Sequence, residues 1–177
     1  MDKNQLIKNL LNFDREVDML YGTSELTFKC YIVGGGALVL TDYVSRVTHD
    51  VDILKAVPDA IIPLMAKYDM NMNVSAHICS FADDCYLRAK KLDIGSRCVE
   101  FYTLSLEDLV VSKLAAARDK DLEDISRPEI IANLNWTLLD EIIETAEEGI
   151  LSDWDRQALK TIYKNYKEDF YSEDTDI

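Results

Sequence analysis

The spacing of apolar residues predicts a helix at the start of the chain and strands across the next eighty residues. Apolar side chains recur at helical spacing over residues 3–21, and Gly22 ends the predicted helix; they are Leu6, Leu10, Phe13, Val17 and Leu20. Runs rich in β-branched and aromatic residues predict four strands, at 26–33, 49–57, 72–81 and 97–104. A further helix is expected over residues 58–70, with Pro58 near its first turn.

The pattern becomes helical from Ser105 onward. Ser105 is the expected N-cap of a helix, because Asp108 follows three residues later as in a capping box. Three more helices are expected, at 126–135, 137–149 and 153–170. Residues 82–92 fit either a short helix or an extended arm, and the sequence leaves both open.

These elements predict an α/β (α+β) fold. We expect a small mixed sheet flanked by helices over residues 1–104, which include the N-terminal helix. Residues 105–177 are expected to form a helical region that packs on this core as part of a single compact unit. A length of 177 residues is sufficient for one such domain.

The composition narrows the class of partner. The chain has 33 acidic and 19 basic residues, a net charge of -14, which disfavours broad DNA binding but leaves room for a local basic cleft. We see no signal peptide and no apolar run of about 20 residues, so the expected location is the cytoplasm and no membrane association is expected. The four cysteines form no C-x-x-C pair, which favours reduced, buried thiols over a zinc site.

Two aspartates stand out inside the second predicted strand. Because side chains alternate along a strand, Asp50 and Asp52 share one face, with Thr48 and, if the strand starts early, Arg46. Val51, Ile53 and His49 are expected on the other face. Two adjacent carboxylates repel each other, and a divalent cation removes that repulsion. Oxygen ligands without a Cys or His cluster indicate Mg²⁺ or Mn²⁺.

The glycines at 34–36 precede this strand and follow the first one. A glycine-rich turn at the start of a helix lets backbone N–H groups approach a phosphate. Known phosphate and calcium motifs do not fit: the third Rossmann glycine is replaced by Val39, a P-loop lacks its Gly-Lys-Ser/Thr ending, and the calcium-binding EF-hand lacks its loop glycine. Glycines, paired carboxylates and a nearby arginine together favour phosphoryl-transfer chemistry.

In this arrangement the sequence resembles the DNA-polymerase-β-like nucleotidyltransferase superfamily. Gly35-Gly36 is followed by thirteen residues and then Asp50-Val51-Asp52, as in that superfamily's signature. The segments "GGGAL", "RVTHDVD" and "LSLEDLVVSKLAAARDKDLEDI" are similar to small bacterial proteins near the abortive-infection, toxin–antitoxin branch. The resemblance covers roughly residues 20–130, and the last 45 residues lie outside it.

The resemblance implies roles for particular residues. Asp50 and Asp52 would hold the metal, Gly35 and Gly36 would cradle the phosphates, and Arg46 and Thr48 would steady the phosphate or the leaving pyrophosphate. Lys113 and Asp121 match the branch's later lysine and acidic positions, with Asp124 beside them. The third catalytic carboxylate is open between Glu100 and Asp121 or Asp124, or is absent; the alternative interpretation of Glu100 is a surface glutamate on an edge strand.

The pattern around Lys113 adds an expectation of its own. Lys113 lies on the apolar stripe of its helix, so its stem should be buried and its ammonium should reach an anion, either a nucleotide phosphate or a catalytic carboxylate.

The function implied is transfer of a nucleotidyl group from a nucleoside triphosphate (NTP) to a hydroxyl, with release of pyrophosphate. The sequence does not distinguish among three acceptors: an RNA 3′ end, a protein side chain and a small molecule. The alternative is a catalytically inactive binding or regulatory module on the same fold.

Overall fold

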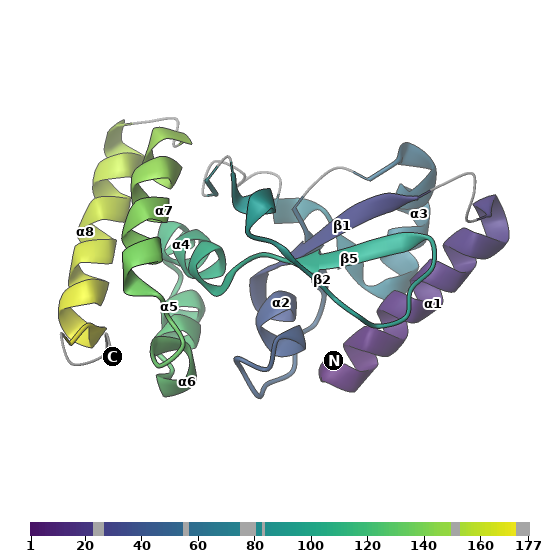
Figure 1. The fold of residues 1–177 in the computed structure, drawn as a ribbon, viewed down its shortest axis with the longest axis horizontal. Coiled ribbons are helices and arrows are strands. Elements are labelled where there is room, and N and C mark those ends of the chain that lie inside the picture. The colour runs from purple at the N-terminus through teal and green to yellow at the C-terminus, as the bar shows by residue number, and fades with distance from the viewer. Residues whose placement is uncertain (23–26, 55–56, 75–80, 83, 150–152, 173–177) are drawn as a thin grey trace. The chain divides into compact units, whose positions relative to one another are not determined.

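The computed structural model describes residues 1–22, 27–54, 57–74, 81–82, 84–149 and 153–172 (Figure 1). The chain divides into two compact units. The first comprises Met1–Ala76 and Tyr86–Leu104 and holds the sheet, whereas the second comprises His77–Cys85 and Ser105–Ile177. Leu104 and Ser105 therefore fall in different units, and residues 77–85 group with the second one.

The sheet is mixed, as the sequence predicts. Its strand order is β3-β2-β1-β5-β4, and β1 (Phe28–Val33) lies at its centre. β1 runs antiparallel to β2 (Val51–Ile53) and parallel to β5 (Val99–Thr103). On the outside, β3 (Met70–Asn71) is parallel to β2, and β4 (Lys90–Lys91) is antiparallel to β5. This arrangement confirms the predicted α/β class.

The N-terminal helix begins and ends where the sequence indicates. α1 (Lys3–Tyr21) is capped by Asp2, whose carboxylate accepts the N–H of Gln5 (2.9 Å), and it ends at Gly22 with φ 71°. Four of the five predicted apolar residues are fully buried, but Leu20 is 60% exposed because it lies in the last turn, past the turns that pack on the core. α2 (Gly34–Leu40) follows β1 directly, with the three glycines as its first turn.

The predicted helix over 58–70 is present in three short pieces. Turns of 3₁₀ helix at Asp59–Ile61 and Ala66–Tyr68 flank α3 (Ile62–Met65), and Asp69 ends the series with a left-handed backbone. Pro63 explains part of the interruption, because proline has no N–H and is tolerated only in the first turn of an α-helix.

Two strand predictions need correction. The second strand is only Val51–Ile53, since its pairing with β1 and β3 involves only these three residues. The predicted strand at 72–81 is wrong for residues 72–74, since pairing with β2 stops at Asn71; residues 75–80 lie outside the described part, and so does His77. Both alternatives for 82–92 occur, as a 3₁₀ turn at Cys85–Leu87 and then β4.

One buried carboxylate joins α1 to the sheet. Asp14 is 2% exposed and accepts the backbone N–H groups of Arg97 (2.9 Å), Cys98 (2.8 Å) and Val99 (2.8 Å). These donors lie at the start of β5, where strand pairing does not yet satisfy them. A buried carboxylate is tolerated here because three hydrogen bonds compensate for its lost hydration.

Every regular element described after Ser105 is a helix, although the predicted helix over 126–135 is present only as Pro128–Ile131. These helices are α4 (Leu106–Ala116), α5 (Asp119–Ile125), α6 (Pro128–Ile131), α7 (Trp136–Gly149) and α8 (Asp153–Phe170). Ser105 caps α4 as predicted, since its hydroxyl accepts the N–H of Asp108 (3.1 Å). α7 and α8 lie side by side (Figure 1), because Asp140 binds Lys167 (2.8 Å) and accepts the Tyr163 hydroxyl.

The side chains of three cysteines lie within these units. Cys30, Cys85 and Cys98 are buried thiols outside any disulfide, as expected for these three residues. Burial raises the pKa of Cys30 to about 12, so this thiol is inert at neutral pH. Within the described ranges, no helix combines the length and apolar composition needed to cross a bilayer.

Candidate active site

The two aspartates lie where β2 begins. Val51 and Ile53 are fully buried, whereas Asp52 is half-buried and Asp50 is exposed, which is the alternation expected of a strand with one face in the core. His49 is exposed and does not share the buried face as predicted, because it precedes the first residue of β2. Asp52 pairs with Val33, the last residue of β1. The antiparallel pairing of β1 with β2 thus brings Asp52 to the start of α2.

Gly34 and Asp52 are in close contact. Gly34 has φ 65°, a backbone conformation that favours glycine. A Cβ atom on Gly34 would lie 2.8 Å from Oδ2 of Asp52, closer than real Cβ contacts come. The glycine at this position therefore serves two needs, since it permits the turn from β1 into α2 and leaves room for a carboxylate.

The next two glycines face the segment before β2. A Cβ atom on Gly35 would lie 2.6 Å from Nη2 of Arg46 and 3.5 Å from the Thr48 hydroxyl. A Cβ atom on Gly36 would lie 3.4 Å from the carbonyl oxygen of Asp50. The structure therefore brings together Gly35, Gly36, Arg46 and Thr48, the residues predicted to contact phosphate. Their phosphate-binding role remains a prediction.

Thr48 is buried and holds the local backbone. Its N–H donates to the carbonyl of Met1 (2.9 Å), and the Met1 amino group donates to the Thr48 carbonyl. The Thr48 hydroxyl donates to the carbonyl of Asp50 (3.3 Å). This pairing fixes the segment that leads into β2, and with it the backbone at Asp50.

Asn71 is a neighbour of the carboxylates that sequence reasoning missed. It is the register partner of Asp52 on β3, and its Nδ2 donates to Oδ2 of Asp50 (3.1 Å). Its own Oδ1 accepts the N–H of Asn73 (2.9 Å). The available signal was an asparagine directly after the predicted 58–70 helix, but the predicted strand began one residue too late to include it.

Glu100 lies at a different level of the sheet. On β1, Glu100 pairs with Lys29 and Asp52 pairs with Val33, so the two acids are four strand positions apart, about 13 Å at 3.3 Å per residue. Glu100 forms an ion pair with Lys91 (2.5 Å), and this hydrogen bond lowers the pKa of the Glu100 carboxyl. Glu100 is half-buried and β5 is paired on both sides, so Glu100 does not lie on an edge strand as the alternative interpretation supposed; its catalytic role stays a prediction.

Lys113, Asp121 and Asp124 form a buried ionic cluster in the second unit. Lys113 is 5% exposed, and its Nζ lies 2.6 Å from Oδ1 of Asp121 and 3.0 Å from Oδ2 of Asp124. Arg118 binds the other oxygen of Asp121 (2.5 Å). The predicted burial of Lys113 on the apolar stripe is thus confirmed, and the anions it reaches are carboxylates.

The cations of this cluster keep Asp121 ionised. Burial alone raises the pKa of Asp121, but the hydrogen bonds from Arg118 and Lys113 outweigh burial and hold the pKa below its usual value. Asp121 is therefore an acceptor of hydrogen bonds at neutral pH, and its oxygens are already used within the second unit. Its predicted catalytic role stays a prediction.

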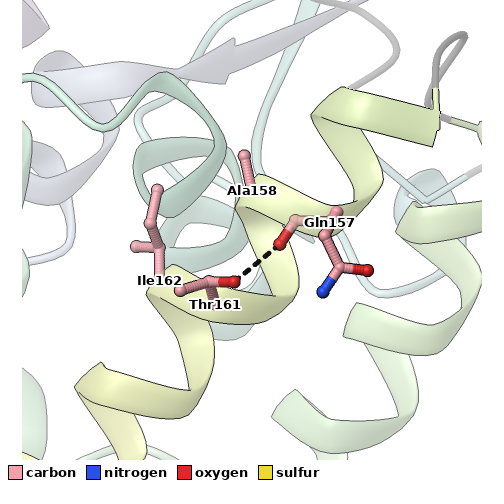
Figure 2. A pocket seen from close by; sticks show the side chains of 4 residues that line it. All are labelled: Gln157, Ala158, Thr161 and Ile162. Carbon is pink, nitrogen blue, oxygen red and sulfur yellow. Dashed lines mark hydrogen bonds between the residues drawn. The ribbon is translucent and has the colours of Figure 1, made fainter.

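A hollow elsewhere on the molecule adds no chemistry to this site. A pocket of about 300 Å³ is lined by Gln157, Ala158, Thr161 and Ile162, all on α8; Figure 2 shows these four side chains. The Thr161 hydroxyl donates to the carbonyl of Gln157 (2.9 Å), and the lining has no ionisable side chain. None of these four residues was predicted to bind substrate.

Comparison with known proteins gives the class. Over residues 8–171 the chain matches a family described as a nucleotidyltransferase of unknown function (DUF6036). The chain belongs to this nucleotidyltransferase family. No curated protein and no solved structure matches it. Family membership agrees with the nucleotidyltransferase activity that the resemblance implied, and it extends over most of the C-terminal region that the resemblance did not cover.

Proposed function

We propose that this protein is a metal-dependent nucleotidyltransferase that moves a nucleotidyl group from an NTP to a hydroxyl acceptor. The observation that carries the proposal is the contact of Gly34 with Asp52, which joins the glycine turn and the carboxylate strand into one surface. Glycines that admit phosphate and carboxylates that hold a cation are the two parts that this chemistry requires. Membership of a nucleotidyltransferase family supports the same class.

The residues present suit a magnesium or manganese ion brought in with a nucleotide. Asp50 and Asp52 would hold it, and the described residues contain no cluster of three or more His, Cys, Asp or Glu side chains that could form a complete protein site. Mg²⁺ is commonly bound by one or two carboxylates together with substrate phosphates. When bound, the cation supplies positive charge that offsets the charge of the triphosphate.

The chain's own groups then position the triphosphate. Gly35 and Gly36 leave space for phosphate oxygens at the start of α2, and Arg46 beside Gly35 supplies a fixed positive charge. The acceptor oxygen forms a bond to the α-phosphorus while the bond to the bridging oxygen breaks. Pyrophosphate leaves with that electron pair, and the hydroxyl proton passes to a base or to water.

One observation favours the alternative, an inactive binding module. Each acid considered as the third catalytic carboxylate is engaged by cations: Glu100 by Lys91, and Asp121 by Lys113 and Arg118. Under this alternative the protein would bind NTP without turning it over. The acids would then serve structural roles only.

Binding and turnover measured together separate the two functions. Calorimetry with Mg-ATP and Mg-GTP should show binding to the wild-type protein that is lost in Asp50→Asn and Asp52→Asn. Pyrophosphate release with each NTP should be lost in the same variants. Binding without pyrophosphate release, with every acceptor class supplied, would favour the inactive module; no binding of any NTP would contradict both.

We further propose that the hydroxyl acceptor is a molecule of the host cell. The protein would then act as the toxin of a bacterial toxin–antitoxin pair. This proposal rests on the resemblance of residues 20–130 to the abortive-infection branch. Expression in a bacterial host should slow growth, and Asp52→Asn should relieve the effect. Incubation of a lysate with α-labelled NTP, followed by separation of RNA, protein and small molecules, would identify the acceptor class; growth unaffected by the wild-type protein would contradict the toxin role.

A further inference from the structure

Asn71 binds the Asp50 carboxylate and lies beside Asp52 in the sheet. It stands opposite Asp52 in the parallel pairing of β2 and β3, and its side chain donates to Oδ2 of Asp50 (3.1 Å). The two strands are held in this register by the Val51 N–H, which bonds the carbonyl of Asp69 (2.8 Å). Asn71 is thus the residue of β3 that faces the carboxylate pair.

The orientation of the Asn71 carboxamide follows from a second hydrogen bond. The N–H of Asn73 can only donate, so it requires an acceptor and takes Oδ1 of Asn71 (2.9 Å). The NH₂ group is therefore the end that faces Asp50. Asn71 acts as a donor toward the carboxylate, and its oxygen is directed to the Asn73 N–H.

A donor at this position has two consequences for the neighbouring charges. It compensates part of the repulsion between Asp50 and Asp52 without adding a charge. It also occupies Oδ2 of Asp50, so that the carboxylate is held in one orientation with its other oxygen left for a cation. An aspartate at position 71 would instead place three negative charges at the site and add a third carboxylate ligand for a cation.

We propose that Asn71 is a positioning residue. It orients the Asp50 carboxylate and adds no charged ligand of its own, so the protein contributes only two carboxylates to the metal site. The inference rests on the proposed function. With only two charged ligands held in place, the protein alone binds a divalent cation weakly, and the phosphates of the nucleotide complete the site. The substrate is therefore the metal–NTP complex, and Asn71 makes metal binding depend on nucleotide.

The test compares opposite changes at one residue. Binding of Mn²⁺ alone is followed through the electron paramagnetic resonance signal of the free ion, and binding of Mg-ATP is followed by calorimetry. Asn71→Ala removes the donor, Asn71→Asp replaces it with a charge, and Asn71→Ser is a second donor-altering variant if the alanine variant does not fold. Asn73→Ala is the matched control, because Asn73 is exposed and contributes only its backbone N–H.

The expected results move in opposite directions. Asn71→Ala should weaken Mg-ATP binding about 10-fold, the scale seen when a residue that orients a metal ligand is removed. Asn71→Asp should bind Mn²⁺ alone about 10-fold more tightly than the wild-type protein, because a third carboxylate adds a ligand and a charge. Asn73→Ala should match the wild-type protein in both measurements.

Two outcomes would overturn the inference alone. The first is Mg-ATP affinity unchanged in Asn71→Ala. The second is a loss of affinity in both variants: Asn71→Asp binds Mn²⁺ more weakly than the wild-type protein, and Asn71→Ala binds Mg-ATP more weakly. That result would indicate that Asn71 has a structural role only. A wild-type protein that binds neither Mn²⁺ nor Mg-ATP would instead overturn the proposed function, and the inference with it.

Discussion

Gly34 and the carboxylate of Asp52 occupy adjoining space, such that a single methyl group on Gly34 would lie 2.8 Å from Oδ2 of Asp52. The contact links the end of β1 to the middle of β2 across eighteen residues of chain. It also means that the turn into α2 and the position of Asp52 cannot change independently. Substitutions at the glycines therefore test the site without removing any of its polar groups.

Gly34→Ala should destabilise the first unit and displace Asp52. A left-handed backbone costs alanine about 1–2 kcal/mol, and the new methyl group pushes on the carboxylate. Gly95→Ala is the control, because Gly95 also has positive φ (79°) but has open space around its Cβ position. Both variants should lower the urea midpoint, and only Gly34→Ala should lose Mg-ATP binding; loss in neither would show that the contact is not needed.

Gly35→Ala should affect binding with little loss of stability. Its Cβ would lie 2.6 Å from Nη2 of Arg46, the far end of a flexible side chain that can shift at low cost. We expect a melting temperature close to that of the wild-type protein and a weaker affinity for Mg-ATP, because the guanidinium is displaced. If Arg46 contributes nothing to binding, Gly35→Ala will bind as the wild-type protein does.

Lys113→Met should strongly destabilise the second unit. The change leaves Asp121 and Asp124 buried without their shared cation, and loss of one partner from a buried ion pair costs about 3–5 kcal/mol. Lys164→Met is the control, since Lys164 is an exposed residue of α8 whose ion pair with Glu168 spans 3.7 Å. Urea unfolding measures both variants.

A compensating change separates structure from nucleotide binding at Lys113. Asp121→Asn and Asp124→Asn, added to Lys113→Met, remove the uncompensated charges and should restore much of the lost stability. If the restored protein still binds Mg-ATP, Lys113 has a structural role only. If it is stable and has lost binding, the predicted contact of Lys113 with phosphate gains support.

Acid should weaken the same cluster. The folded-state pKa of Asp121 lies below its usual 3.8, so its ionised form favours the folded state above that value, and this contribution is lost as pH falls through the folded-state pKa. Asp121→Asn should therefore flatten the fall in melting temperature between about pH 5 and pH 2. An unchanged slope would mean that Arg118 and Lys113 do not stabilise the charge.

The sequence predicted the Gly34–Asp52 region well because its determinants are local. The alternation of Val51, Asp52 and Ile53 follows from strand geometry, and the glycines mark the turn before it. The predicted start of α4 is correct for a similar reason, since Ser105 and Asp108 form its cap within one turn. Such features depend on neighbours a few residues apart.

The parts that sequence analysis missed depend on distant pairing. Asn71 is placed by its register with Asp52, and a strand of two residues has no period to read. The partners of Lys113 are eight and eleven residues later in the sequence. They reach Lys113 because α4 ends at Ala117, which has φ 50°, and the chain then turns back into α5. Glu100 fitted the expected strand pattern. The register of β5 against β1 decides which β1 residue it pairs with, and the residues next to Glu100 in the sequence do not reveal that register.

The bonds of Asp14 have a consequence for the order in which the chain folds. They span 83 to 85 residues, and the central pairing of β1 with β5 also joins distant residues, such as Phe28 and Val99. Loop closure on this scale must occur before these contacts stabilise anything, which makes folding slow compared with a local helical bundle. During synthesis, β1 lacks its neighbour on that side until β5 has left the ribosome. The N-terminal hundred residues therefore become a stable sheet only as a set, and a nascent chain shorter than this has an open strand edge.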